Sequence, residues 1–328
     1  MKIILAGGDG QVGRLLGRAL ARDRHECVVL TRRRENSRHE PSGLRRVRWD
    51  GVTVGEWAAE LEGADVVINL AGRSVDCRYT EGNLAEMLGS RVDSTRVLGR
   101  AIAAAARPPR VWLQASTATI YAHRFDTPND EATGMIGGAE AGVPALWGRS
   151  IGIAQAWERE LFAAATPHTR RVALRSAMVM SPDRGGVFRV LAALCRCGLG
   201  RHGDGRQFVS WIHGEDFAHA VKFLLSRDDL AGVFNLAAPE PLPNREFIAA
   251  IHTALGSKLA VPLPRWALEL GAFFLRTETE LILKSRRVVP GRLLGSGFEF
   301  RFPSWPEAAK NLVAQTRACR NPLNPPPP

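Results

Sequence analysis

The N-terminal stretch Lys2-Ile3-Ile4-Leu5-Ala6-Gly7-Gly8-Asp9-Gly10-Gln11-Val12-Gly13 decides the fold of this 328-residue chain. Residues 3–5 are apolar and run directly into glycines, which predicts a short buried strand that ends in a turn. Apolar residues then recur at helical spacing, at positions 12, 15, 16, 19 and 20. The stretch is therefore predicted to form a strand, a glycine turn and a helix.

The three glycines of this turn have separate tasks. Gly7 permits the tight turn, Gly10 lets the backbone approach a pyrophosphate, and Gly13 lets the helix pack against the strand. The start of the helix, at Gln11 and Val12, presents free N–H groups and a positive dipole end to phosphates. Three spaced glycines are weak evidence alone, but their place between a strand and a helix predicts dinucleotide binding rather than a plain glycine-rich turn.

Composition narrows the class of protein. With 45% hydrophobic and 23% charged residues, the chain has the composition of an ordinary soluble globular protein. No apolar run reaches the length of a membrane span, and Met1 stands directly before the first strand, so we expect a cytoplasmic protein without a signal peptide. The five cysteines are scattered, which predicts buried thiols in a reducing compartment and no metal site.

The net charge of +11 invites a nucleic-acid interpretation, which the distribution of charge does not favour. Only five of the 44 basic residues are lysines. The arginines are spread along the chain and are not interleaved with aromatic residues, as a nucleic-acid surface would require. We therefore expect small-molecule partners and no nucleic acid or membrane.

The predicted second strand, residues 26–31, bears on the choice of cofactor. It leads into Thr31-Arg32-Arg33-Arg34, with no acidic residue at the strand end. An acid there would bind the 2′-hydroxyl of NAD, whereas a basic residue accommodates the 2′-phosphate of NADP. The pattern favours NADP(H), with contacts from Thr31 and Arg32; the alternative is a solvated basic turn.

Strands and helices alternate as far as residue 178. Further strands are predicted at 44–49, 64–70, 111–115 and 171–178, and helices at 86–105 and 149–165. The order predicts an α/β fold with a doubly wound parallel sheet of the Rossmann type. The fourth strand ends in small residues that would let a cofactor lie across the strand ends: Asn69, Leu70, Ala71 and Gly72.

The pattern loosens beyond Ser181. Residues 185–205 are glycine-rich and basic; helices are predicted at 215–225, 244–255, 262–275 and 305–313, and strands at 233–236 and 299–302. We expect a cofactor domain of residues 1–180 plus about 206–237. A smaller, interlocked substrate-capping domain would comprise residues 181–205 and 238–315, followed by a disordered proline-rich tail, 316–328.

These residues together resemble the extended short-chain dehydrogenase/reductase superfamily, in particular its atypical NAD(P)-dependent epimerase/dehydratase-like proteins related to sugar-nucleotide epimerases. The spacing of Gly7, Gly10 and Gly13 is that of the extended group, and residues 69–72 match its small-residue motif. Residues 116–121 resemble the segment that carries the catalytic Ser/Thr, which the resemblance places at Thr117. Residues 203–207, 210–216, 235–239, 244–247 and 287–294 resemble motifs of the subgroup. The resemblance also implies cofactor contacts at Ser90, Arg91 and Ser116.

One departure from the superfamily matters for chemistry. The usual Tyr-x-x-x-Lys pair, in which lysine lowers the tyrosine pKa, is absent. Four residues after the two tyrosines stand Asn83 and Phe125, and no lysine lies between Lys2 and Lys222. The resemblance places the tyrosine position at Ser150 and the lysine position at Ala154.

Three residues are candidates to replace the pair. Tyr121 could serve as the acid, although its place in the motif usually makes it a structural or substrate contact. His213 has a suitable pKa, but a histidine before a helix is more often buried and hydrogen-bonded. Thr117 can orient a carbonyl without supplying a proton efficiently.

Two functions remain open on the sequence. One is an NADP-dependent oxidoreductase or epimerase-like isomerase acting on a small polar or nucleotide-linked substrate, in a cleft between the carboxyl edge of the sheet and residues 181–315. The other is a catalytically weak or silent NADPH-binding sensor or scaffold. Either is expected to be a monomer or a homodimer.

Overall fold

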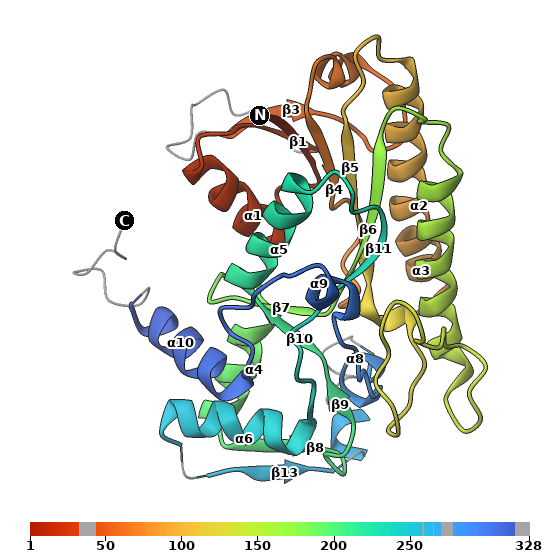
Figure 1. Ribbon diagram of the computed structural model, residues 1–328. Coiled ribbons are helices and arrows are strands. Elements are labelled where there is room, and N and C mark those ends of the chain that lie inside the picture. The colour runs from red at the N-terminus through yellow and green to blue at the C-terminus, as the bar shows by residue number, and fades with distance from the viewer. Residues whose placement is uncertain (33–43, 258, 265, 270–277, 319–328) are drawn as a thin grey trace.

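A computed structural model describes residues 1–32, 44–257, 259–264, 266–269 and 278–318 (Figure 1). Its centre is a sheet of seven strands in the order β11-β6-β5-β4-β1-β2-β3, with every neighbouring pair parallel. The predicted doubly wound parallel sheet is confirmed. The strands are β1 (Lys2–Ala6), β2 (Glu26–Thr31), β3 (Leu44–Arg48), β4 (Val66–Asn69), β5 (Val111–Thr117), β6 (Arg170–Ser176) and β11 (Gly232–Leu236).

Helices cover both faces of the sheet, because successive strand residues point to opposite sides. On one face Ile3 and Leu5 pack with apolar residues of α1 (Gln11–Arg22) and α5 (Gly214–Ser226). On the other face Ile4 and Ala6 pack with α2 (Glu81–Ala104), α3 (Ala145–Ala163) and the 3-10 helix η1 (Glu56–Leu61). The strand order reverses between β1 and β4, so the crevice at the carboxyl ends of these strands is where a ligand of such a sheet binds.

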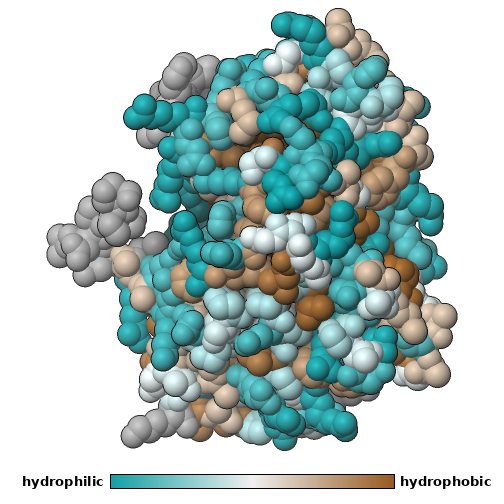
Figure 2. All heavy atoms as spheres, in the orientation of Figure 1, coloured by the Kyte–Doolittle hydropathy of each residue, from teal (hydrophilic) through white to brown (hydrophobic). Residues whose placement is uncertain are grey.

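A second core lies beyond the carboxyl end of the sheet, at the bottom of Figure 1. There α4 (Val187–Arg196), α6 (Asn244–Leu255) and α10 (Trp305–Ala318) enclose Trp305, which is stacked 4.0 Å from the ring of Phe247. The face shown in Figure 2 is largely hydrophilic, with small scattered apolar areas. The remaining short elements are η2 (Ala118–Ile120), β7 (Met178–Met180), β8 (Leu199–His202), β9 (Phe208–Val209), β10 (Trp211–His213), β12 (Leu242–Pro243), β13 (Val261–Leu263), α8 (Glu280–Leu283) and α9 (Gly291–Gly295).

Several predicted boundaries need correction. Helix α2 begins at Glu81 rather than at residue 86, because the Thr80 side chain accepts a hydrogen bond from the backbone N–H of Asn83 and caps it. No strand forms at 299–302, since the N–H groups of Arg301 and Phe302 donate to the buried Asp216 carboxylate instead of to a neighbouring strand. Residues 185–205, for which no helix or strand was predicted, contain helix α4 and strand β8.

The C-terminal expectations lie partly outside the described residues. Helix α10 runs to Ala318, so residues 316–318 of the expected tail are helical, whereas 319–328 lie outside the described residues. Of the predicted helix 262–275, residues 262 and 263 belong to strand β13 and 266–269 are helical, whereas 265 and 270–275 lie outside the described residues. None of the described helices is both long and apolar enough to cross a membrane. Among the described residues, no three His, Cys, Asp or Glu side chains gather to hold a metal ion.

Candidate functional site

The turn between β1 and α1 is closed so tightly that two of its glycines cannot be replaced without movement. Gly7 has φ +73°, and a Cβ added to it would lie 2.7 Å from the Cα of Ala71. A Cβ on Gly13 would lie 2.5 Å from the Cα of Gly8. At the start of α1, Gly10 supplies no side-chain cap, so backbone N–H groups of the first turn remain for another acceptor. The turn therefore offers an anion-binding site.

The Gln11 and Val12 side chains at this helix start are half-buried. Gln11 Nε2 donates to the hydroxyl of Ser181 over 2.7 Å, which ties the turn to the loop after β7. The segment after β4 lies opposite. Asn69 is fully buried, its Oδ1 accepts from the N–H of Ala71 over 3.0 Å, and its amide shapes the turn that leads through Leu70 to the exposed Gly72.

The end of β2 is basic, but an acidic residue of the glycine turn also contacts it. The hydroxyl of Thr31 donates to the carboxylate of Asp9, and Arg46 Nε lies 3.2 Å from the same carboxylate. Arg32 is exposed beside them, whereas residues 33 and 34 lie outside the described residues. The sequence pattern missed Asp9 because it precedes its partner Thr31 by 22 positions. The end of β2 is thus followed by Arg32 and contacts Asp9, whose carboxylate already pairs with Arg46 of β3.

Ser90 and Arg91 both hold the segment that follows Gly72. The Ser90 hydroxyl accepts from the N–H of Arg73 over 2.9 Å, and Arg91 donates to the carbonyl of Arg73 over 3.1 Å. The Arg91 guanidinium lies 5.0 Å over the ring of Trp157, and burial lowers its pKa to about 10. A half-buried cation therefore underlies the segment that holds predicted cofactor residues.

Ser116 and Tyr121 belong to one buried chain of polar contacts. Ser116 donates to the carboxylate of Glu158 over 2.6 Å, and Glu158 pairs with Arg175 over 2.7 Å. Arg175 donates to the Tyr121 hydroxyl, which donates to Asn235 Oδ1, each over 2.9 Å. Tyr121 is 2% exposed, and burial raises its pKa. Its hydroxyl is thus engaged on both sides inside the molecule.

His213 is likewise held by internal partners. It caps α5, with Nδ1 accepting from the N–H of Glu215 and Nε2 in contact with Asn311 Oδ1, both over 3.1 Å. Its ring lies 4.0 Å from that of Phe302, and burial lowers its pKa. The structure brings His213 together with residues of the C-terminal helix and its preceding loop.

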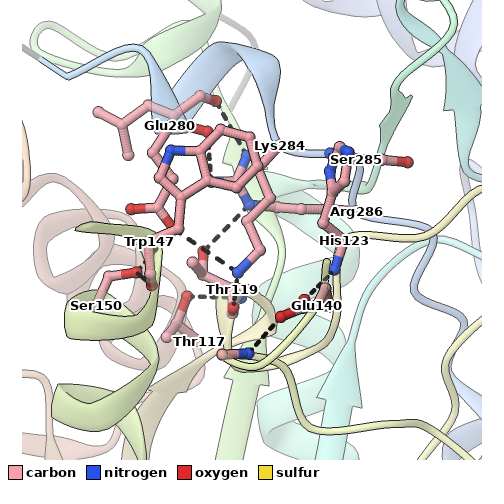
Figure 3. A network of polar contacts seen from close by, with 12 residues as sticks. Thr117, Thr119, His123, Glu140, Trp147, Ser150, Glu280, Lys284, Ser285 and Arg286 are labelled. Atoms are coloured by element: carbon pink, nitrogen blue, oxygen red, sulfur yellow. Dashed lines mark hydrogen bonds and ion pairs between the residues drawn. The ribbon is translucent and has the colours of Figure 1, made fainter. Parts of the chain in front are cut away.

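Thr117 ends β5 at the carboxyl edge of the sheet and is half-buried. Its hydroxyl oxygen accepts from the N–H of Thr119 over 3.1 Å. Close beyond it, two residues missed by the sequence reasoning join the same cluster, Glu280 and Lys284 (Figure 3). Glu280 lies 130 positions from its partner Ser150, and Lys284 lies 165 positions from Thr119. The sequence offers one indication of such a role: Lys284 is one of only five lysines and stands just before the motif at 287–294.

A parallel sheet with a glycine turn beside its switch point defines a dinucleotide-binding Rossmann protein. Residues 3–140 match the model of the NAD dependent epimerase/dehydratase family, and residues 263–312 match a domain of unknown function, DUF1731. The chain belongs to this epimerase family. The human epimerase family protein SDR39U1 is 30% identical over 320 residues, which cover 96% of this chain and 100% of the relative.

Two further comparisons agree. The epimerase family protein YfhF of Bacillus subtilis is 30% identical over 326 residues, 97% of this chain and 99% of the relative. The crystal structure of human SDR39U1 with NADPH superimposes with a TM-score of 0.82 at 29% identity, covering 96% of this chain and 99% of that chain. UDP-N-acetylglucosamine 4-epimerase from Bacillus cereus, at 18% identity and a TM-score of 0.66, shares the fold.

Proposed function

We propose that this chain is an NADP(H)-binding oxidoreductase or epimerase-like isomerase that acts on a small polar or nucleotide-linked substrate. The observation that carries the proposal is the β1–α1 turn, whose uncapped helix start lies near a basic strand end. Unpaired N–H groups at a helix start favour a phosphate, and a guanidinium favours a second one. The human relative solved with NADPH supports the same choice of cofactor.

The described residues fit such a dinucleotide. Gly7 and Gly13 keep the turn free of the side chains that would fill the space beside Ala71 and Gly8. We expect the N–H groups at Gln11 and Val12 to bind the pyrophosphate, and Thr31 and Arg32 to bind the ribose and its 2′-phosphate. Residues 69–72, Ser90, Arg91 and Ser116 line or support the remaining path toward β5.

When bound, the dinucleotide supplies a hydride donor or acceptor. The first residue of the chain that takes part is Thr117. Its hydroxyl oxygen accepts a hydrogen bond from the N–H of Thr119, so its hydroxyl proton points away from that N–H. In this proposal the Thr117 hydroxyl donates to a substrate carbonyl and orients it at the end of β5.

The alternative is a catalytically weak or silent NADPH sensor or scaffold. One observation favours it: Tyr121 and His213, two of the three candidate proton donors, are committed to internal contacts. The two functions differ in what the site holds. The structure of the protein purified from its host with its natural ligands should show a small molecule within hydrogen-bond reach of Thr117 and of the nicotinamide. A nicotinamide enclosed by apolar side chains alone would favour the sensor.

We further propose a cytoplasmic protein, monomeric or homodimeric, without nucleic-acid or membrane partners. The described cysteines at positions 27, 77, 195 and 197 are all free thiols, the state expected in a reducing compartment. Loss of binding to DNA-cellulose at near-physiological ionic strength would support the absence of a nucleic-acid role.

A further inference from the structure

A buried ionisable cluster stands at the carboxyl end of β5. Lys284 Nζ donates to the backbone oxygen of Thr119 over 2.8 Å and lies 3.7 Å from Glu280 Oε1. Ser150 Oγ donates to the same Glu280 oxygen over 2.7 Å (Figure 3). The Lys284 and Glu280 side chains are 0% and 1% exposed. Three segments far apart in the chain therefore meet at one charged centre.

The cluster lies at the edge where a Rossmann sheet binds its ligand. Thr119 is two residues beyond Thr117, the last residue of β5. Ile151 and Ala154 of α3 pack against Ala118 and Ile120 in the same turn, which brings Ser150 to this edge. Ser150 is half-buried, whereas its partner Glu280 is buried. Of Ser150, Glu280 and Lys284, Ser150 is thus the one that is partly exposed.

The cluster is not explained by stability. A buried ion pair commonly costs as much as it contributes, because both charges lose their water. Within the described part of the chain, Glu280 Oε2 is buried without a hydrogen-bond partner, which adds a further cost. Groups retained at such a cost are typical of functional sites.

Burial sets the Lys284 ammonium apart from an ordinary, solvated lysine. Burial is the largest cause that lowers its pKa to about 8, Glu280 opposes this shift, and Arg286 adds to it. The cluster therefore changes its protonation near neutral pH. The other titratable groups that face it are Glu140 and His123 from the loop after η2 and Tyr79 from the segment before α2.

We propose that Ser150 is the catalytic residue that exchanges a proton with the substrate, and that Glu280 and Lys284 are positioning residues that act through it. Glu280 accepts or returns the serine proton, and Lys284 fixes Glu280 and supplies the compensating charge. This inference rests on the proposed NADP(H)-dependent function. In this proposal Ser150 and Lys284 take the place of the missing Tyr-x-x-x-Lys pair, and the lysine comes from the segment that matches DUF1731.

The proposed reaction is the oxidation of an alcohol by oxidised NADP. The substrate O–H proton passes to Ser150 Oγ while the serine proton passes to Glu280 Oε1. The carbinol C–H bond breaks and its electron pair leaves as hydride to oxidised NADP, so that a carbonyl compound forms. Glu280 then returns its proton to Ser150 Oγ, which passes its own proton to water, and the reverse sequence reduces a carbonyl. The substrate class is accordingly a secondary alcohol or its ketone.

The first test follows reduction of 9,10-phenanthrenequinone, an activated dicarbonyl probe, by NADPH at 340 nm. Ser150→Ala should lower the single-turnover rate by roughly 10²-fold or more, the usual range for a lost proton donor. Lys284→Met should remove the pH dependence of this rate near pH 8. The matched controls, exposed Ser226→Ala and Lys222→Met at the Asp23 ion pair, should keep the wild-type rate and profile.

A second measurement does not depend on turnover. Because the chain has only five lysines, their 13Cε resonances can be separated by NMR after selective labelling. The Lys284 resonance should titrate near pH 8 and shift on addition of NADP(H) and in Ser150→Ala. A Lys284 resonance that titrates with the other lysines, or an unchanged rate in Ser150→Ala, would overturn the proposal. Failure of NADPH to bind at all would instead refute the proposed function, so affinity is measured first for every variant.

Discussion

Lys284 donates a hydrogen bond to the backbone oxygen of Thr119 over 2.8 Å, across a sequence separation of 165 residues. Arg286 reinforces the same link, since its Nε donates to the Thr119 hydroxyl over 3.2 Å. The segment that matches DUF1731 is therefore built into the carboxyl edge of the sheet. It does not merely follow the dinucleotide-binding half.

This link predicts that the two expected domains do not separate. Because buried contacts join residues 280–288 to β5 and to the loop after it, a fragment ending near residue 237 should lose them and fold poorly. Limited proteolysis followed by mass spectrometry checks this. Release of a stable, separately folded C-terminal fragment would contradict the interlocked arrangement.

The unfolding free energy should depend on pH through the protonation of Lys284. Its pKa is about 8 when folded and 10.5 when exposed, so the unfolded chain binds more protons between these values. Stability contributed by this group therefore rises with pH from about 8 to 10.5, at about 1.4 kcal/mol for each unit. Urea unfolding at pH 7.5 and 9.5 measures this effect. The unfolding free energy of the wild-type protein relative to that of Lys284→Met should rise by about 2 kcal/mol from the lower pH to the higher.

The control for this measurement is Lys222→Met, which removes a partly exposed lysine paired with Asp23 over 2.6 Å. Its difference from wild type should stay nearly constant over the same range. A constant difference for Lys284→Met as well would show that Lys284 is protonated normally in the folded state.

Gly13→Ala tests the glycine turn. The new methyl group would lie 2.5 Å from the backbone of Gly8, so α1 must move away from the turn. We expect a loss of about 1–3 kcal/mol in unfolding free energy and at least tenfold weaker NADPH binding. Gly82→Ala in α2, whose Cβ would meet nothing within 4 Å, should leave NADPH affinity unchanged and keep or slightly raise stability, as calorimetry and thermal denaturation can show. Normal NADPH affinity in Gly13→Ala would place the dinucleotide elsewhere.

Tyr121→Phe separates a structural role from a catalytic one. The hydroxyl bridges Arg175 and Asn235, and its loss leaves both buried groups with one partner fewer. The expected result is about 1–3 kcal/mol of lost stability with NADPH affinity and quinone reduction retained. Full stability together with abolished turnover would instead make Tyr121 the proton donor.

Local patterns were sufficient to predict most of the sheet. Residues 2–13 indicated the strand, turn and helix, and the near-continuous apolar strands indicated a parallel sheet. Both predictions succeed because the spacing of apolar residues in a helix or a strand is a local property of the sequence. The contacts of Asp9 with Thr31 and Arg46 could not be found in this way, since they join a loop to two strands. Lys284 and Glu280 were missed for the same reason. A search at four-residue spacing cannot find a lysine that reaches the site from 130 positions or more away.

We propose that this chain binds NADP(H) through the β1–α1 turn and the basic end of β2. Calorimetric titration of wild type and Arg32→Ala with NADPH and NADH tests it most directly, with Arg107→Ala, near the amino end of β5, as control. We expect NADPH to bind about 10-fold or more tighter than NADH, the size expected for a charge-assisted hydrogen bond to the 2′-phosphate, and Arg32→Ala to remove most of this preference. Equal affinity of the wild-type protein for the two dinucleotides, or no binding of either, would contradict this mode of binding.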